Sequence, residues 1–488
     1  MSAPLATSPK VSTRRVWESL ERWVVTTSVS NKTNSAESSL KKPAGQGRLP
    51  FVPQVSERYG CAGIPSIKCL LCRRDNGTGE TRHFRADSKL FLQPRKARLR
   101  QFHPVTPSSR SRVDPFLAMD VLDRANALAR SGRTVFHLEA GQPGTRAPKR
   151  ALQAAQQALA DDKLGYTEAV GRPLLRERIA RFYRETYGVG VAPERIVITT
   201  GSSAGFLLAF IALFESGQSL ALAAPGYPAY RNIALALGLR AQFIPCREAE
   251  QFRLTAKAIG DTRDIDGVLI ASPGNPSGTM IPADELEAIS DVCDKRGLKL
   301  ISDEIYHGIT YGSRAQTALA FSPNTVVINS FSKYFSMTGW RIGWMVVPED
   351  MVRTIERLTQ NFYISPPTIS QVAALAALDA TDELDAHVRT YGANRARLLA
   401  ALKDAGFGAV APADGAFYLY ADVSPFNIDA ATFARRLLEE AGVAATPGHD
   451  FDPFDGDRWI RFSYAGAQNE VDSAATTLVA WCRALPRT

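Results

Sequence analysis

The sequence predicts an α/β protein in which helices cover both faces of a mostly parallel β-sheet. Short apolar runs typical of strands alternate with helix-patterned stretches from Pro115 onward. These runs are apolar almost throughout, as expected of parallel strands that are buried on both faces. With 488 residues, 45% of them hydrophobic and 22% charged, the chain can bury a large core and should hold more than one domain.

The expected elements begin with a helix over FLAMDVLDRANALARSG. Its apolar residues recur at helical spacing, and Gly132 is a stop signal. Helix and strand patterns then alternate, in the order LLRERIARFYRETYG (helix), RIVITT (strand), AGFLLAFIALF (helix) and SLALAAP (strand).

After a longer connection, the alternation continues toward the C-terminus. The next elements are GVLIASP (strand), ADELEAISDVCDKRG (helix), LKLISDE (strand) and TVVINSF (strand). A long helix near DELDAHVRTYGANRARLLAALKDAG then leads into a smaller α+β region that ends in DRWIRFSYAG. Ligands of such sheets bind just beyond the carboxyl ends of the strands, so polar residues at those ends are the candidates for a functional site.

The leading segment, residues 1–110, differs from the rest in composition. It holds 20 Lys and Arg against 7 Asp and Glu, whereas the remaining 38 basic and 42 acidic residues leave a net charge of −4. Its Ser-, Lys- and Gly-rich stretches lack periodicity, so we expect a basic, disordered extension or a mis-assigned start near residue 105, rather than a targeting peptide. The overall charge of +9 is therefore no argument for a nucleic-acid partner.

Hydropathy and cysteine spacing argue against a membrane-spanning protein, a disulfide framework and a metal site. No apolar run approaches the roughly 20 residues that a membrane-spanning helix needs, so no membrane partner is expected. Cys246, Cys293 and Cys482 show no paired spacing, which fits a reducing compartment and predicts a cytoplasmic protein. Cys69 and Cys72 could be drawn as part of a zinc site, but no second tight pair exists and no metal is expected.

Polar residues gather at three of the predicted strand ends. ITTGSSAGF turns from strand to helix, where free N–H groups suit an anion such as phosphate, although small residues are ordinary at such a turn. SPGNPSGT places Asn275 in a turn fixed by Pro276, and a rigid turn alone would explain it. SDEIYHGITY places Asp303 after a buried strand, where a carboxylate needs a cation or hydrogen bonds, unless it caps a helix.

A fourth segment, NSFSKYFSMTGWRIGW, holds Lys333 among serines and aromatic residues. A lysine in apolar surroundings loses solvation as a cation, so its pKa falls and its amine becomes nucleophilic, unless the ammonium reaches out to water. Together the four segments supply an anion cradle, a carboxylate, a phenol, an amide, a reactive amine and an arginine. Pyridoxal phosphate needs this set for its phosphate, pyridine nitrogen, ring oxygen and aldehyde.

The sequence resembles the class I, fold-type I pyridoxal-phosphate-dependent aminotransferases over roughly residues 110–488. The motifs SPGNPSGT, SDEIY, SFSKYFSMTGWRIG and WIRFSYAG carry the resemblance. It implies a fold-type I PLP-transferase with a large domain, residues 147–385, around a mostly parallel seven-stranded sheet. A smaller α+β domain would comprise residues 111–146 and 386–488.

The resemblance also implies roles for the coenzyme-binding residues. Lys333 is expected to form the Schiff base with the coenzyme and to move the substrate proton, while Asp303 pairs with the pyridine nitrogen. The other residues implied are Tyr306 and Asn275 at the ring oxygen, Tyr227 against the ring, and Ser202, Ser203, Ser330 and Arg341 at the phosphate, with Ser332 a weaker candidate.

Substrate recognition and assembly follow from the same resemblance. Arg461 corresponds to the arginine that grips the substrate α-carboxylate through two hydrogen bonds, with Asn275 and the backbone of Gly141 nearby. Tyr166 resembles a tyrosine that reaches the coenzyme phosphate of the neighbouring subunit, which implies a homodimer with shared active sites. A lysine often stands at the position of Ser203 in the aspartate-using bacterial branch, and its absence weakens a claim for aspartate.

The expected function is that of an aminotransferase of amino-acid metabolism. It would move an amino group from an L-amino acid to a 2-oxo acid, such as 2-oxoglutarate, by a ping-pong mechanism through Lys333. One alternative is a pyridoxal-phosphate-dependent carbon–sulfur lyase or other β-eliminating enzyme, which would use the same Lys and Asp. Another is a transcription regulator with an aminotransferase-like sensor, although the leading segment shows no helix–turn–helix pattern.

Overall fold

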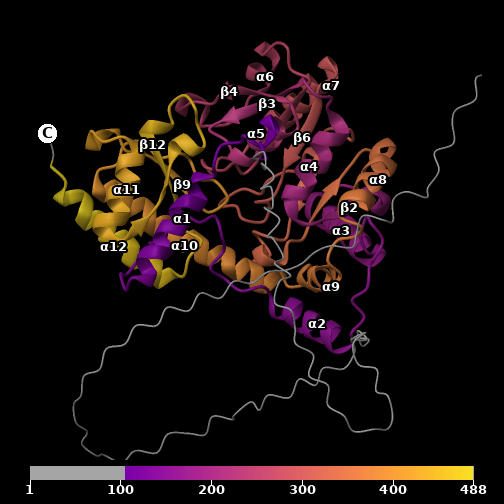
Figure 1. Cartoon of the computed structure of the whole chain (residues 1–488), viewed down its shortest axis with the longest axis horizontal. Coiled ribbons are helices and arrows are strands. Elements are labelled where there is room, and N and C mark those ends of the chain that lie inside the picture. Colours follow the sequence, from indigo (N-terminus) through magenta and orange to yellow (C-terminus); the bar gives the residue numbers. More distant parts are fainter. Residues whose placement is uncertain (1–104, 487–488) are drawn as a thin grey trace, which may run out of the picture. The chain divides into compact units, whose positions relative to one another are not determined.

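The computed structural model describes residues 105–486 (Figure 1). The expectations for residues 1–104, including the Cys69–Cys72 pair, lie outside the described residues. No helix in the described part of the chain is long and apolar enough to cross a membrane.

The central feature is a seven-stranded sheet with the strand order β2-β8-β7-β6-β5-β3-β4. All neighbouring strands are parallel except around β8, which runs antiparallel to both β2 and β7. The strands are β2 (Ile196–Thr199), β3 (Ser219–Ala224), β4 (Arg240–Pro245), β5 (Gly267–Ala271), β6 (Lys299–Asp303), β7 (Val326–Ser330) and β8 (Gly343–Val346).

Helices cover both faces of this sheet, because successive strand residues bury their side chains in opposite directions. In β5, Leu269 packs in the same cluster as Phe206 of α4, whereas Val268 and Ile270 pack in the cluster that holds Leu286 of α7. The helices of this part of the chain are α2 (Lys149–Ala160), α3 (Pro173–Tyr187), α4 (Gly201–Leu213), α5 (Pro228–Ala236), α6 (Ala256–Asp261), α7 (Ala283–Arg296), α8 (Val352–Phe362) and α9 (Thr368–Ala377).

A smaller α+β part stands beside the large sheet (Figure 1). Its antiparallel sheet has the order β11-β12-β9, and a parallel pair joins β1 to β10. The elements are α1 (Leu117–Arg130), β1 (Phe136–His137), α10 (Thr381–Ala405), β9 (Tyr418–Asp422), α11 (Ala430–Ala441), β10 (Val443–Ala444), β11 (Thr446–Pro447), β12 (Trp459–Ser463) and α12 (Gln468–Ala484).

The predicted fold class is confirmed, and the structure adds elements that the sequence pattern did not resolve. The longer connection between β3 and β5 contains α5, β4 and α6. Strand β4 escaped notice because it is a half-exposed edge strand without a sustained apolar run. Helix α4 begins at Gly201, ahead of the AGFLLAFIALF pattern, since Ser202 and Ser203 already have helical backbone. The domain limits at residues 147 and 385 stay a prediction.

Candidate active site

A cavity of about 290 Å³ opens at the carboxyl ends of the parallel strands. It lies between the large sheet and the smaller α+β part, because β12 and α1 contribute to its wall. The residues predicted from the sequence that line it are Gly141, Ser202, Ser203, Tyr227, Asn275, Asp303, Tyr306, Ser332, Lys333, Arg341 and Arg461.

Lys333 lies in the turn that follows β7, and its side chain is partly buried in the cavity wall. Its Nζ donates a hydrogen bond to the Gly141 carbonyl at 2.6 Å and lies 5.9 Å from the ring centroid of Tyr306. Burial, together with the positive charges of Arg461 and Arg341, lowers the pKa of Lys333 to about 8. About a tenth of this amine is therefore neutral at pH 7, a far larger share than for an exposed lysine.

Asp303 ends β6, and its carboxylate is buried in the floor of the cavity. The Tyr230 hydroxyl donates to one carboxylate oxygen, and the Ile305 N–H donates to the other at 3.0 Å. Burial raises the pKa of Asp303 to about 6, although both hydrogen bonds and Lys333 oppose the shift. The carboxylate is thus ionised at neutral pH and available to a cationic ring nitrogen.

Tyr306 and Asn275 reach the cavity from the loops after β6 and β5, which are neighbouring parallel strands. The Tyr306 hydroxyl lies 2.8 Å from the Tyr418 hydroxyl. The Asn275 side-chain oxygen accepts a hydrogen bond of 3.0 Å from Arg461. A phenol and an amide therefore lie beside the carboxylate and the amine, as a pyridine ring with a hydroxyl group would need.

Arg461 of β12 is a buried cation in the cavity wall, with a relative exposure of 1%. Its guanidinium lies between the Tyr418 and Phe451 rings, at 4.5 and 4.7 Å from their centroids. Within residues 105–486 it has only neutral hydrogen-bond acceptors and no carboxylate partner, and its Nε has no acceptor at all. A buried charge without a counter-ion is costly, so this site favours a bound anion.

An anion cradle forms where β2 turns into α4. Gly201 has φ of +75°, and a Cβ there would collide with the Arg341 guanidinium. The first N–H groups of α4 therefore lie close to Arg341, with Ser202, Ser203, Ser332 and Thr338 in the same cavity wall. A helix N-terminus, hydroxyls and a guanidinium form a donor set that fits a phosphate group.

Two residues predicted for the site do not line the cavity. Ser330 is buried, and its hydroxyl lies 2.9 Å from the Ser332 hydroxyl and donates to the Ile342 carbonyl at 3.1 Å. Tyr166 is 82% exposed and is not among the residues that line this cavity. For both residues the predicted contact with the coenzyme stays a prediction.

Sequence reasoning missed several residues that the fold brings to the cavity. Tyr230 follows Tyr227 by three residues, so it lies on the same side of the start of α5, and this spacing was the available signal. Tyr418 and Thr338 carried no local signal. The start of α1 also lines the cavity, through Phe116, Ala118, Met119 and Leu122.

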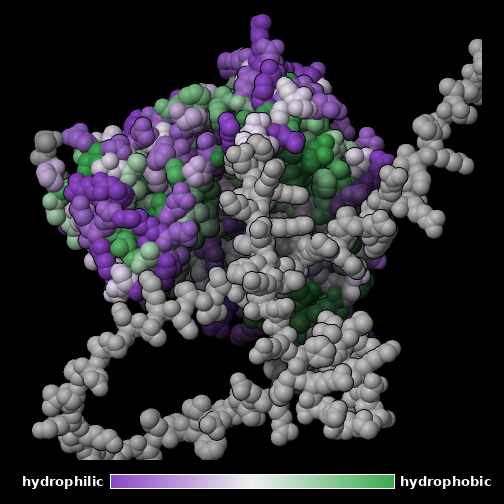
Figure 2. Space-filling model, in the orientation of Figure 1, coloured by the Kyte–Doolittle hydropathy of each residue, from purple (hydrophilic) through white to green (hydrophobic). Residues whose placement is uncertain are grey.

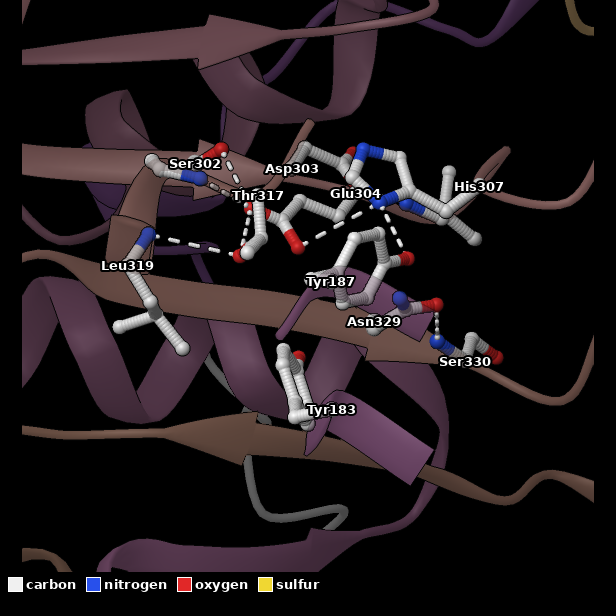
Figure 3. Close-up of polar contacts among 12 residues, drawn as sticks. Tyr183, Tyr187, Ser302, Asp303, Glu304, His307, Thr317, Leu319, Asn329 and Ser330 are labelled. Atoms are coloured by element: carbon white, nitrogen blue, oxygen red, sulfur yellow. Dashed lines mark hydrogen bonds and ion pairs between the residues drawn. The ribbon is translucent and has the colours of Figure 1, made fainter. Parts of the chain in front are cut away.

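Next to Asp303, a buried polar cluster supports the loop that carries the site (Figure 3). One Glu304 oxygen accepts hydrogen bonds from Thr317 and Ser302, and the other lies 3.6 Å from Nδ1 of His307. Nδ1 also lies 2.8 Å from the Tyr187 hydroxyl. Burial raises the pKa of Glu304 to about 8 and lowers the pKa of His307 to about 3, so both groups are predominantly neutral at pH 7.

The residues present fit pyridoxal phosphate. The cradle at Gly201 is suited to a phosphate, Asp303 to a protonated pyridine nitrogen, and the Lys333 amine to an aldehyde. In the described residues, no group of three or more His, Cys, Asp or Glu is placed to hold a metal ion.

Comparisons with known proteins agree with this chemistry. A family model described as aminotransferase class I and II matches residues 133–478. The valine–pyruvate aminotransferase of Mycobacterium tuberculosis is 46% identical over 377 residues, which are 76% of this chain and 97% of the relative.

Solved structures agree as well. An aminotransferase from Mycobacterium tuberculosis has a TM-score of 0.76 at 45% identity, covering 78% of this chain and 100% of its own. An aspartate aminotransferase from Thermus thermophilus, solved with maleate, has a TM-score of 0.73 at 29% identity, and the match covers 77% of this chain and 100% of the solved chain. These matches confirm the predicted fold-type I architecture, transaminase activity and pyridoxal-phosphate dependence, and the chain belongs to the class I and II aminotransferase family.

Proposed function

We propose that this aminotransferase takes the amino group from a neutral L-amino acid with a short aliphatic side chain and passes it to a monocarboxylic 2-oxo acid such as pyruvate. The cationic side chains in the cavity wall are Lys333, Arg341 and Arg461. The coenzyme linkage, the phosphate and the substrate α-carboxylate would each occupy one of them. In the described part of the wall, no cation then remains for a second carboxylate.

The cavity wall at α1 supports the same substrate class. Phe116, Met119 and Leu122 are apolar, so they suit an alkyl side chain, whereas a charged one would lose its solvation without a partner. The name of the Mycobacterium tuberculosis relative, valine–pyruvate aminotransferase, agrees with both the donor and the acceptor proposed here.

In this proposal each of the polar residues in the cavity wall has a specific role in binding or proton transfer. Arg461 holds the α-carboxylate through a bidentate pair of hydrogen bonds, which orients the Cα–H bond of the substrate. Once the substrate amino group has displaced it from the coenzyme, the freed Lys333 amine, with its pKa of about 8, would take the proton from Cα and return it to Cα when the reaction runs in the opposite direction. When bound, pyridoxal phosphate supplies the carbon that accepts the amino group and a ring that takes up the electron pair released at Cα. Asp303 keeps that ring cationic, and Tyr306 donates a hydrogen bond to its oxygen.

The observation that carries the proposal is the buried guanidinium of Arg461, without a carboxylate partner among residues 105–486, in a cavity that apolar residues of α1 also line. A substrate panel on the holoenzyme tests it, with alanine, 2-aminobutyrate, valine, aspartate and glutamate as donors, and pyruvate or 2-oxoglutarate as acceptor. We expect 2-aminobutyrate and valine with pyruvate to exceed the acidic donors by about 100-fold or more in kcat/KM, because the second carboxylate would be buried without a partner. Aspartate with 2-oxoglutarate as the preferred pair would contradict the proposal.

We also propose that the active unit is a homodimer in which Tyr166 serves the neighbouring subunit. The turn that holds Tyr166 is hydrogen-bonded to the first residue of α9, since the Thr368 hydroxyl donates to the Gly165 carbonyl at 2.6 Å. Large apolar side chains are exposed in this region, among them Ile364 at 53% and Leu159 at 60%. Figure 2 shows residues coloured as hydrophobic near the place where Figure 1 labels α9. Such a surface is typical of a subunit interface.

The cytoplasmic location predicted from the sequence also stays a proposal. It is supported by Cys246, Cys293 and Cys482, which are buried and free, as expected of thiols in a reducing compartment.

A further inference from the structure

Helix α1 receives its N-terminal cap from a distant residue. The residue at its N-cap position is Phe116, which has no side-chain acceptor for the first free N–H groups. The Asp450 carboxylate accepts hydrogen bonds from the Leu117 N–H at 3.4 Å and the Ala118 N–H at 3.2 Å. Asp450 itself is fully buried. A carboxylate more than 300 residues away therefore fixes the start of this helix.

The two sides of α1 have different tasks. Met119 and Leu122 of its first half line the cavity, together with Phe116 just before it. Ala125, in the second half, packs with Leu438 of α11 and Ala444 of β10, in a small apolar cluster. One side of α1 thus lines the cavity, while Val121 and Ala125 on the other side pack against the smaller α+β part.

Asp450 also lies at a junction of the site. The next residue, Phe451, covers one face of the Arg461 guanidinium at 4.7 Å, and its carbonyl accepts a hydrogen bond of 3.0 Å from Gly226, next to Tyr227. The Asp450 carbonyl accepts a hydrogen bond of 2.7 Å from Arg231 of α5. One short segment therefore contacts the carboxylate-binding arginine, the loop beside the coenzyme pocket and the start of the apolar wall.

Other contacts at the start of α1 come from an aromatic pair and an exposed ion pair. The Phe116 ring meets the Tyr227 ring edge-on at 5.6 Å, and Arg231 lies 4.0 Å from the Asp114 carboxylate, which is exposed. The ion pair between Arg124 and Glu439 is exposed and holds the second half of the helix. Loss of the cap would therefore loosen the first turn of α1, next to Phe116 and Met119 in the cavity wall, while Val121 and Ala125 keep the rest of the helix packed.

We propose that Asp450 is a positioning residue that sets the apolar wall of α1 against the substrate side chain and thereby sets the preference for side-chain size. The inference deepens the proposed function and rests on it. Because the cap acts on the helix and not on the α-carboxylate, it should affect discrimination between side chains more than it affects the shared chemistry.

The test compares kcat/KM for alanine, 2-aminobutyrate and valine, with pyruvate or 2-oxobutyrate as acceptor, in the holoenzyme and in Asp450→Ala. We expect the preference for valine over alanine to fall about three- to tenfold, because wall contacts to the extra methyl groups are lost. Met119→Ala, which truncates the wall itself, should change the preference in the same direction. In Asp450→Asn, which keeps an acceptor for the cap, most of the wild-type preference should return.

A matched control removes a cap elsewhere. Asp429 caps α11 through the Thr432 N–H at 2.9 Å, and that helix does not line the cavity. Asp429→Ala should leave the substrate preference unchanged. Hydrogen exchange gives a second measurement, in which amides 117–122 should exchange about fivefold or more faster in Asp450→Ala and at the wild-type rate in Asp429→Ala.

The outcomes separate the two proposals. Equal loss of kcat/KM for all three donors, unchanged exchange of α1, or an Asp450→Asn variant that matches Asp450→Ala would overturn the role of Asp450. A wild-type enzyme that does not use aliphatic donors would overturn the proposed substrate class. In that case the hydrogen-exchange comparison would still show whether Asp450 fixes α1.

Discussion

At the scale of single residues, burial turns ordinary side chains into reactive ones. Lys333 and Asp303 have pKa values of about 8 and 6, and in both cases burial is the largest cause. Burial disfavours the charged form of each group, so it lowers the pKa of the Lys333 ammonium and raises the pKa of the Asp303 carboxyl. At pH 7 the site therefore still holds a largely charged Asp303, together with a Lys333 amine that loses its proton readily.

Arg461→Lys should show that substrate binding depends on the bidentate geometry of the guanidinium more than on its charge. Lysine keeps the charge but cannot make two parallel hydrogen bonds to a carboxylate. We expect kcat/KM for the preferred amino acid to fall about 100-fold, which corresponds to about 2.7 kcal/mol. The slow reaction with an amine that lacks the carboxylate is the internal control and should be unchanged. An equal loss for both substrates would mean that the variant disturbs the whole site.

Tyr230→Phe should shift the pH dependence of the reaction. The Tyr230 hydroxyl donates to Asp303 and lowers its pKa, so its removal raises that pKa further above 6 and keeps Asp303 protonated to higher pH. The acid limb of the kcat/KM profile should therefore move to higher pH. Tyr183→Phe, which removes a buried hydroxyl outside the cavity wall, serves as control. An unmoved acid limb in Tyr230→Phe would contradict the role given to Asp303.

At the scale of elements, the junctions between strand and helix carry the site. The β2–α4 turn brings N–H groups to Arg341, while the end of β6 presents Asp303 to the cavity and Glu304 to a buried cluster. Parallel strands make this possible because their carboxyl ends meet at one edge of the sheet.

Gly201→Ala should weaken coenzyme binding. Alanine disfavours the φ of +75° found at this position, and its Cβ would displace the Arg341 guanidinium. We expect the Kd of the apoenzyme for pyridoxal phosphate to rise at least about tenfold, measured by absorbance titration. Gly260→Ala in α6 is the matched control, because no atom lies within 4 Å of the added Cβ. Equal affinities in the two variants would rule out the cradle.

Glu304→Gln should flatten the pH dependence of stability. The folded protein holds the Glu304 proton up to about pH 8, whereas the unfolded chain releases it above about pH 4.5, so stability falls as pH rises through this window. Glutamine keeps the shape and does not titrate. The melting temperature of the variant should exceed that of the wild type by about 2 °C or more at pH 8, with the difference shrinking toward pH 5. Parallel curves from pH 5 to 8 would mean that Glu304 is ionised in the folded protein.

At the scale of the whole molecule, the cavity joins the large sheet to the smaller α+β part, and the dimer proposal adds a second subunit. Tyr166 is 82% exposed, so its use in the reaction requires a partner.

Mixing Lys333→Ala with Tyr166→Ala tests the shared site. In a mixed dimer, the subunit that keeps Lys333 receives Tyr166 from its partner, so one complete site forms. Random pairing should restore about one quarter of the wild-type activity, whereas each variant alone is impaired. The measurement is a rate assay after subunit exchange, with the dimer verified by light scattering. No gain on mixing, despite mixed dimers, would show that Tyr166 does not serve its neighbour.

The sequence predicted the elements that have a strong local pattern, and missed those that depend on context. Helix α1 and strands β5 and β6 were found because their apolar residues are continuous or periodic. Strand β8, which is antiparallel within the sheet, was not resolved as a separate strand, because it follows the Lys333 segment after a short turn.

Local spacing in the chain determined which chemical groups this protein could bring to a coenzyme. Asp303 and Tyr306 lie within one turn, and Lys333 and Arg341 lie in one connection, between β7 and β8, so each pair stays close in any fold that keeps these segments. Only the tertiary structure decided that Tyr418 meets Tyr306, that Arg461 is buried without a carboxylate partner among residues 105–486, and that Asp450 caps α1. The physical reason is that these contacts join segments 112 to 333 residues apart, and packing of the two sheets, rather than any local pattern, brings such segments together.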